Sequence, residues 1–62
     1  MIYTIFGATI DDVRELVDAL NYEKVDYTRP GPWKFQINDP EDMGIFEDLC
    51  DGFGLDYEGL WE

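Results

Sequence analysis

Apolar and polar positions in the first third of the chain follow two different periods. Residues 1–6 ("MIYTIF") form a β-rich run that is apolar on both faces, which is typical of a central strand, and Gly7 ends this run. From residue 10 to residue 20 the apolar positions recur every three or four residues, which predicts an amphipathic helix. Its packed side is predicted to consist of Ile10, Val13, Leu16, Val17 and Leu20. Thr9 and Asp12 have the spacing of a capping box at its start. Asn21 is the predicted helix stop.

The middle of the chain has the alternating pattern of a β-hairpin. In "EKVDYT", Val25 and Tyr27 alternate with charged neighbours, as in a half-buried strand. Pro30 and Gly31 suit the two central positions of a type II turn. The following "WKFQIN" is predicted to be the second strand of the hairpin, with one apolar face formed by Trp33, Phe35 and Ile37.

A second helix is predicted to begin after Asp39, because a capping side chain is followed by proline at the first helical position. Gly52 and Gly54 are predicted to end it, and "LDYEGLWE" then closes the chain as a strand. The predicted apolar arc of this helix consists of Ile45, Phe46, Leu49, Cys50 and Phe53, with Met43 at its margin.

The resulting order is β-α-β-β-α-β within a single domain, residues 1–62. This order predicts an α+β, ferredoxin-like sandwich, in which an antiparallel sheet carries two helices on one face. The alternative is a three-stranded α+β arrangement in which the last eight residues form a loose tail.

Charge is distributed unevenly along the chain. The net charge is −11, from 15 acids and four bases, and all the bases lie between residues 14 and 34. The last 28 residues contain nine acids and no base. Such a charge opposes direct binding to nucleic acid or to an anionic membrane, and it favours a basic partner.

The chain lacks the residues that several classes of catalytic and metal-binding site require. The chain has no Ser and no His, which excludes serine triads, Cys-His dyads and histidine metal clusters. Its six glycines match no phosphate-binding motif, and "DLCDGFGLDYEG" fails the spacing of a calcium loop. We therefore expect no catalytic residues, no metal and no cofactor. Carboxylate pairs such as Asp48 with Asp51 are interpreted as solvated surface.

The lone Cys50 offers no internal disulfide, which agrees with a reducing compartment, and its position predicts a buried helix face. No apolar run approaches the length of a membrane span, and "MIYTIFGATIDD" lacks the features of a secretory signal. We expect a cytoplasmic protein.

The acids recur on one side of each predicted helix. If the two helices lie side by side, their outward sides combine eight acids into one negative surface, offset by Arg14 alone. The simpler interpretation is that these acids keep a small protein soluble. A rigid negative face could also occupy a groove shaped for DNA, with aromatic anchors at Tyr57, Trp61 and Trp33, for each of which core or edge packing is the alternative. The candidate acids are Asp11, Asp12, Glu15, Asp18, Glu41, Glu47, Asp48 and Asp51.

The closing segment "FGLDYEGLWE" resembles that of the regulator of ribonuclease activity B (ribonuclease E inhibitor) family, and "TRPGPWKFQIND" is similar to that family's Arg-Pro and aromatic stretch. Leu60 interrupts the match, and this chain is shorter than the members of that family. The resemblance implies a ferredoxin-like acidic protein that binds and restrains an RNA-degrading endonuclease. The matching residues are Gly54, Tyr57, Glu58, Gly59 and Trp61.

Charge and resemblance predict the same function. We expect a non-enzymatic protein that inhibits or regulates a nuclease or another nucleic-acid-handling protein by engaging its basic surface, as phage-encoded nucleic-acid mimics do. It would bind neither nucleic acid nor membrane directly, and would be a monomer or a weak homodimer. The alternative is a structural or assembly module, with a homodimer formed through the sheet.

Overall fold

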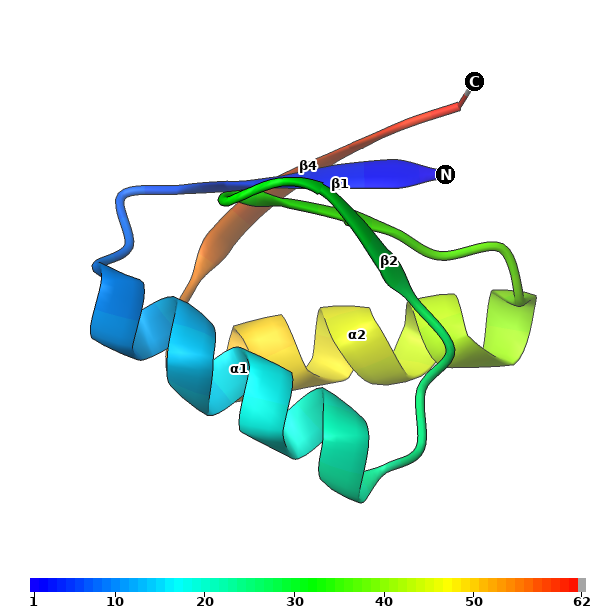
Figure 1. Ribbon diagram of the computed structural model, residues 1–62, viewed down its shortest axis with the longest axis horizontal. Coiled ribbons are helices and arrows are strands. Elements are labelled where there is room, and N and C mark those ends of the chain that lie inside the picture. The colour runs from blue at the N-terminus through cyan, green and yellow to red at the C-terminus, as the bar shows by residue number, and fades with distance from the viewer. Residues whose placement is uncertain (62) are drawn as a thin grey trace.

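The computed structural model describes residues 1–61, which form one antiparallel sheet covered on one face by two helices (Figure 1). The strand order in the sheet is β2-β3-β1-β4. This topology confirms the predicted ferredoxin-like fold, and the alternative with a three-stranded sheet is wrong because the last strand pairs fully with the first. The elements are β1 (Ile2–Phe6), α1 (Ile10–Tyr22), β2 (Thr28–Gly31), β3 (Lys34–Gln36), α2 (Pro40–Phe53) and β4 (Asp56–Leu60).

The central strand β1 sets the register of the sheet. Tyr3 lies opposite Phe35 of β3 on one side and opposite Gly59 of β4 on the other. Because side chains alternate along a strand, Tyr3 and Ile5 point toward the helices and are buried. The even-numbered residues of β1, among them the exposed Phe6, lie on the open face.

Local capping chemistry fixes the helix ends. Thr9 and Asp12 form the predicted capping box, and Asp39 caps α2 ahead of Pro40. Gly54 ends α2 in the left-handed conformation, at φ 71°, as a glycine does without strain. Gly52, predicted to end the helix together with Gly54, lies inside α2, because a single glycine is tolerated in a helix. The predicted stop of α1 at Asn21 is wrong. The helix continues through Tyr22, because the backbone N–H groups that follow it still find carbonyl acceptors in its last turn.

The hairpin differs from its prediction in both the strand and the turn. Val25 and Tyr27 precede β2 and lie in a connecting segment, although Val25 is buried. The turn has Pro32 and Trp33 at its centre, since Gly31 pairs with Lys34. Pro30 therefore lies within β2. An edge strand tolerates proline because the missing N–H faces no partner strand.

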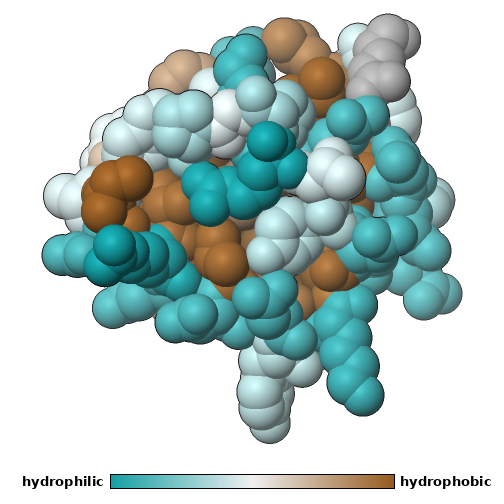
Figure 2. All heavy atoms as spheres, viewed as in Figure 1, coloured by the Kyte–Doolittle hydropathy of each residue, from teal (hydrophilic) through white to brown (hydrophobic). Residues whose placement is uncertain are grey.

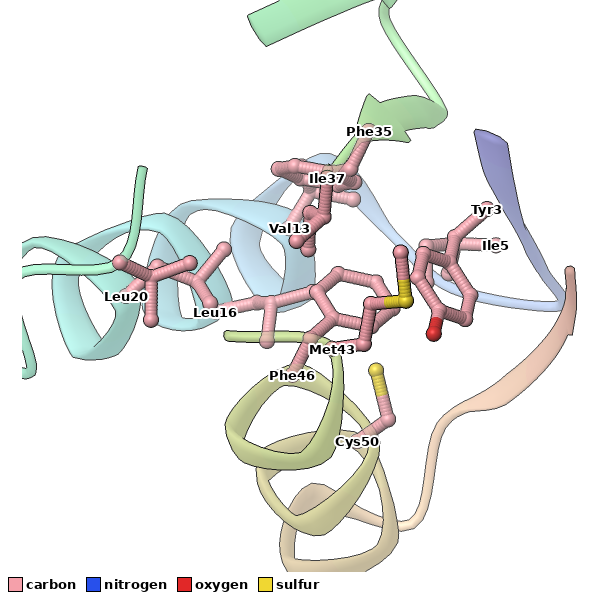
Figure 3. Close-up of a cluster of buried hydrophobic side chains, with 11 residues drawn as sticks. Tyr3, Ile5, Val13, Leu16, Leu20, Phe35, Ile37, Met43, Phe46 and Cys50 are labelled. Carbon is pink, nitrogen blue, oxygen red and sulfur yellow. The ribbon is translucent and has the colours of Figure 1, made fainter. Parts of the chain in front are cut away.

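The core is aromatic at its centre (Figure 3). The ring of Phe46 lies 4.4 Å from that of Tyr3 and 5.4 Å from that of Phe35, measured between ring centroids. Cys50 is fully buried, as predicted. Two helix positions differ from the prediction. Met43 is buried in the core, whereas Phe53, the last residue of α2, is 42% exposed.

Some apolar side chains reach the surface beside the core, although the core residues themselves are at most 8% exposed. Figure 2 shows apolar atoms between the sheet and α1, framed by hydrophilic side chains. At the start of α1, Ile10 was expected on the packed side of the helix, but it is 50% exposed. Neither helix formed within residues 1–61 has the length and apolar character that a bilayer crossing needs.

Candidate partner-binding surfaces

All eight candidate acids lie on the two helices, and six of them are exposed. The helices contact each other and lie on the same face of the sheet, so their outward sides form one surface (Figure 1). We call six exposed carboxylates on these sides the acidic helix surface. Arg14 is the one base in the sequence of the two helices, and it is exposed within this surface. The six residues are Asp11, Glu15, Asp18, Glu41, Asp48 and Asp51.

The periodicity of each helix explains this grouping. Asp11 and Asp18, like Glu41 and Asp48, are seven residues apart and therefore lie two turns apart on the same side of their helix. Acids in the first turn are also favourable there, because they face the positive end of the helix dipole. Gly44 lies on the exposed side of α2 as well, and a Cβ added to it would meet no atom within 4 Å.

Glu47 does not belong to the acidic helix surface, and its predicted outward position is wrong. Its side chain is half-buried and lies under the sheet. The hydroxyl of Tyr3 donates a 2.7 Å hydrogen bond to Oε2 of Glu47, and the hydroxyl of Tyr57 donates a 3.5 Å hydrogen bond to Oε1. Glu47 lies four residues after Met43 and three before Cys50, so it shares the side of α2 on which these two residues are buried.

The two tyrosines remain protonated beside this carboxylate. Burial raises the pKa of the Tyr3 hydroxyl well above its ordinary value, and the hydrogen bond to Glu47 and its negative charge raise it further. Burial and the nearby Glu47 also raise the pKa of Tyr57. For Cys50, burial raises the pKa of the thiol to about 12, with smaller contributions from Asp51 and Glu47. A thiol with so high a pKa is a poor nucleophile at neutral pH, so we assign Cys50 a structural role in the core.

Asp12 is only partly available to a partner. Its Oδ2 accepts a 3.0 Å hydrogen bond from the backbone N–H of Thr9, and Thr9 Oγ1 in turn accepts from the N–H of Asp12. This reciprocal pair fixes the start of α1. We therefore assign Asp12 to helix capping.

Two of the three candidate aromatic anchors pack against the core, and the third is exposed. Tyr57 is half-buried and makes edge-to-face contacts with Tyr3 and Phe46, at centroid distances of 5.9 and 6.2 Å. Trp33 is also packed against the core. Trp61 is different, because it is 74% exposed.

Trp61 and the acidic helix surface are not brought together. Trp61 directly follows β4, whose C-terminal end is the one farther from the helices (Figure 1). Its neighbour Leu60, which the sequence analysis did not select, is 61% exposed. Leu60 alternates with the half-buried Tyr57 and shares the open face of the sheet with Asp56 and Glu58, which explains its exposure. The pattern of β4 alone does not tell which face the helices leave open.

Within residues 1–61 the structure offers no concave site for a small molecule. No pocket is found in this part of the chain, and no group of three or more of its His, Cys, Asp and Glu side chains is arranged to hold a metal ion.

Comparisons with protein-family models, with curated proteins and with solved structures found no match for this chain.

Proposed function

We propose that this protein is a non-enzymatic binding protein that inhibits or regulates a nuclease or another nucleic-acid-handling protein by engaging its basic surface. The observation that carries the proposal is the acidic helix surface, in which six exposed carboxylates on two adjacent helices are accompanied by one base. The resemblance of the closing segment to the regulator of ribonuclease activity B family supports the same class of partner.

Electrostatics favours such a partner on physical grounds. A protein that binds DNA presents Lys and Arg side chains to about one phosphate charge per 1.7 Å of duplex axis. A rigid face with a high density of carboxylates can take the place of those phosphates, and the net charge of −11 accelerates the encounter through long-range attraction. The helices hold their carboxylates at fixed spacings, which a disordered acidic tail would not.

The proposal is tested by affinity capture on the immobilised protein from a nuclease-treated cell extract, with elution by increasing salt. We expect a nucleic-acid-handling enzyme to be retained at physiological ionic strength and its activity to fall when the free protein is added. Contacts between surface charges weaken steeply with salt, so the eluting salt concentration measures the electrostatic contribution.

Two matched double variants distinguish binding through the acidic helix surface from binding through net charge alone. The double variant Glu15→Gln with Asp48→Asn removes one carboxylate from each helix. The control, Glu23→Gln with Asp26→Asn, removes the same two residue types from the exposed segment after α1. We expect the partner to elute at clearly lower salt from the helix variant than from the control.

Equal losses in the two variants would mean that net charge alone holds the partner, and would contradict the role of the helices. Retention of scattered basic proteins only at low salt would contradict the proposal as a whole, because the acids would then serve solubility.

A further inference from the structure

One long edge of strand β4 is free of a partner strand. β4 is the last strand in the order β2-β3-β1-β4, so it has a partner strand on one side only. Its five residues pair with β1 in an unbroken antiparallel register, from Asp56 opposite Phe6 to Leu60 opposite Ile2. A regular edge strand of this kind is a template for the addition of another strand.

The hydrogen bonds of β1 identify which backbone groups face this edge. The N–H of Ile5 donates to the carbonyl of Trp33, and Met1 exchanges two backbone hydrogen bonds with Ile37. The odd-numbered residues of β1 therefore bond toward β3, and its even-numbered residues bond toward β4.

The partners of those even-numbered residues in β4 are Asp56, Glu58 and Leu60. It follows that the alternate residues, Tyr57 and Gly59, direct their N–H and C=O groups away from β1. In the described part of the chain, no other strand lies on that side of β4. Two residues thus present a ready set of donors and acceptors at the edge.

The opposite edge of the sheet, formed by β2, is protected against strand addition. β4 is therefore the edge at which another strand can add. β2 contains Pro30, which has no N–H to donate, and its register against β3 shifts between Thr28 and Gly31. A proline and an irregular register are features that block strand addition at sheet edges. β4 has neither of them.

Charge decides which strand would add to β4. Asp56 and Glu58 are exposed and share the open face of the strand, next to the exposed Leu60. A second copy of this chain, paired in antiparallel fashion along the same edge, would bring these carboxylates opposite or diagonal to one another, which is unfavourable. A segment with Lys or Arg at alternate positions would place its cations beside them. Trp61 and Leu60 provide apolar area at the end of the strand.

We propose that the free edge of β4 binds an extended polypeptide segment with basic residues at alternate positions, by adding it as a fifth strand to the sheet. The backbone groups of Tyr57 and Gly59 supply the hydrogen bonds, and Asp56 and Glu58 select the basic pattern. This inference concerns residues outside the acidic helix surface, so it stands or fails independently of the proposed function.

The test uses a short end-blocked peptide in which Lys alternates with Val, together with amide hydrogen exchange of the full protein. In the free protein the amides of Tyr57 and Gly59 should exchange faster than that of Glu58, which is bonded to β1. Saturating peptide should slow exchange at Tyr57 and Gly59 by about tenfold or more, because new backbone hydrogen bonds protect them. Exchange that stays unchanged at both amides while the peptide binds would overturn the proposal.

Two peptide controls test the mechanism. The same peptide with alternate backbone nitrogens methylated loses its donors on one edge, and should bind at least about tenfold more weakly. A peptide of the same composition with its lysines contiguous should also bind more weakly, since it cannot place cations at alternate positions. Equal affinity for all three peptides would show attraction by net charge alone and would overturn strand addition.

Two protein variants with equal changes in charge locate the contact. Glu58→Lys reverses a charge beside the edge, whereas Asp48→Lys makes the same reversal on the acidic helix surface. We expect Glu58→Lys to weaken peptide binding by about tenfold relative to Asp48→Lys. Equal effects, or a stable homodimer of the free protein by light scattering that occupies the edge, would contradict the proposal.

Discussion

The hydroxyl of Tyr3 donates a 2.7 Å hydrogen bond to Oε2 of Glu47, joining the central strand to the second helix across 44 positions of sequence. The ring of Tyr3 is buried against Phe46, and Glu47 is half-buried beside it. This pair is the shorter of two side-chain hydrogen bonds that join the sheet to Glu47 of α2, the other coming from Tyr57 of β4 at 3.5 Å. It also explains why one acid of α2 faces inward while its neighbour Asp48 is exposed.

Removing this link should destabilise the fold. Tyr3→Phe keeps the ring in the core but leaves the half-buried carboxylate without its closest donor. We expect the free energy of unfolding to fall by about 1–2 kcal/mol. Urea denaturation measures it, and a double-mutant cycle with Glu47→Leu, which removes the acceptor, isolates the coupling between the two side chains. Asp48→Asn is the control, with an expected change within about 0.5 kcal/mol. Zero coupling would contradict the assigned role of the pair.

Alkaline pH should destabilise the protein through Cys50. The pKa of this thiol is raised by burial from its ordinary value of 9.0 to about 12. The stabilisation is fully present below pH 9, where the unfolded thiol is still protonated, and it is lost as the pH rises toward 12. Between pH 9 and pH 10 the wild type should lose about 1 kcal/mol more than a Cys50→Ala variant. The raised pKa of Tyr3 extends the loss to higher pH. Parallel curves for the two proteins would contradict this account.

Two glycine substitutions should change the stability of the protein in opposite directions. A Cβ on Gly59 would lie 2.6 Å from Sδ of Met1, a flexible side chain that can move aside, and 3.1 Å from Cε1 of the buried Tyr3 ring, which cannot, so Gly59→Ala should cost about 1 kcal/mol of stability. Gly44 lies in the interior of α2, and a Cβ there meets open space. Gly44→Ala should therefore stabilise the protein by about 0.5–1 kcal/mol, because alanine loses less backbone entropy in a helix. Thermal denaturation of the two variants checks both signs.

Lys24 stores backbone strain after the end of α1. It is the non-glycine residue with positive φ in the described chain, at 57°. Lys24→Gly should be more stable than Lys24→Ala by about 1 kcal/mol, since both remove the same charge and only glycine adopts this conformation without a Cβ penalty. Equal stabilities in chemical denaturation would show that the loop relaxes its conformation at no cost.

The local signals of the sequence were sufficient for the elements whose ends are fixed by side-chain chemistry. Thr9 with Asp12, and Asp39 with Pro40, predicted both helix starts, and Gly54 predicted the end of α2. The hairpin was predicted less well. Pro30 and Gly31 satisfy the chemistry of a type II turn, but pairing of Gly31 with Lys34 moves the turn to Pro32 and Trp33.

The sequence by itself determined the β-α-β-β-α-β order, the buried position of Cys50 and the exposed acids of the two helices, because hydrophobic period and capping chemistry act over a few residues. Only the tertiary structure decided that Glu47 turns inward to Tyr3, that Trp61 is far from the acidic helix surface, and that Tyr57 and Gly59 face a free edge. These features depend on which strand lies beside which. Strand neighbours are set by contacts between residues far apart in the sequence, and the periodicity of a single segment does not encode them.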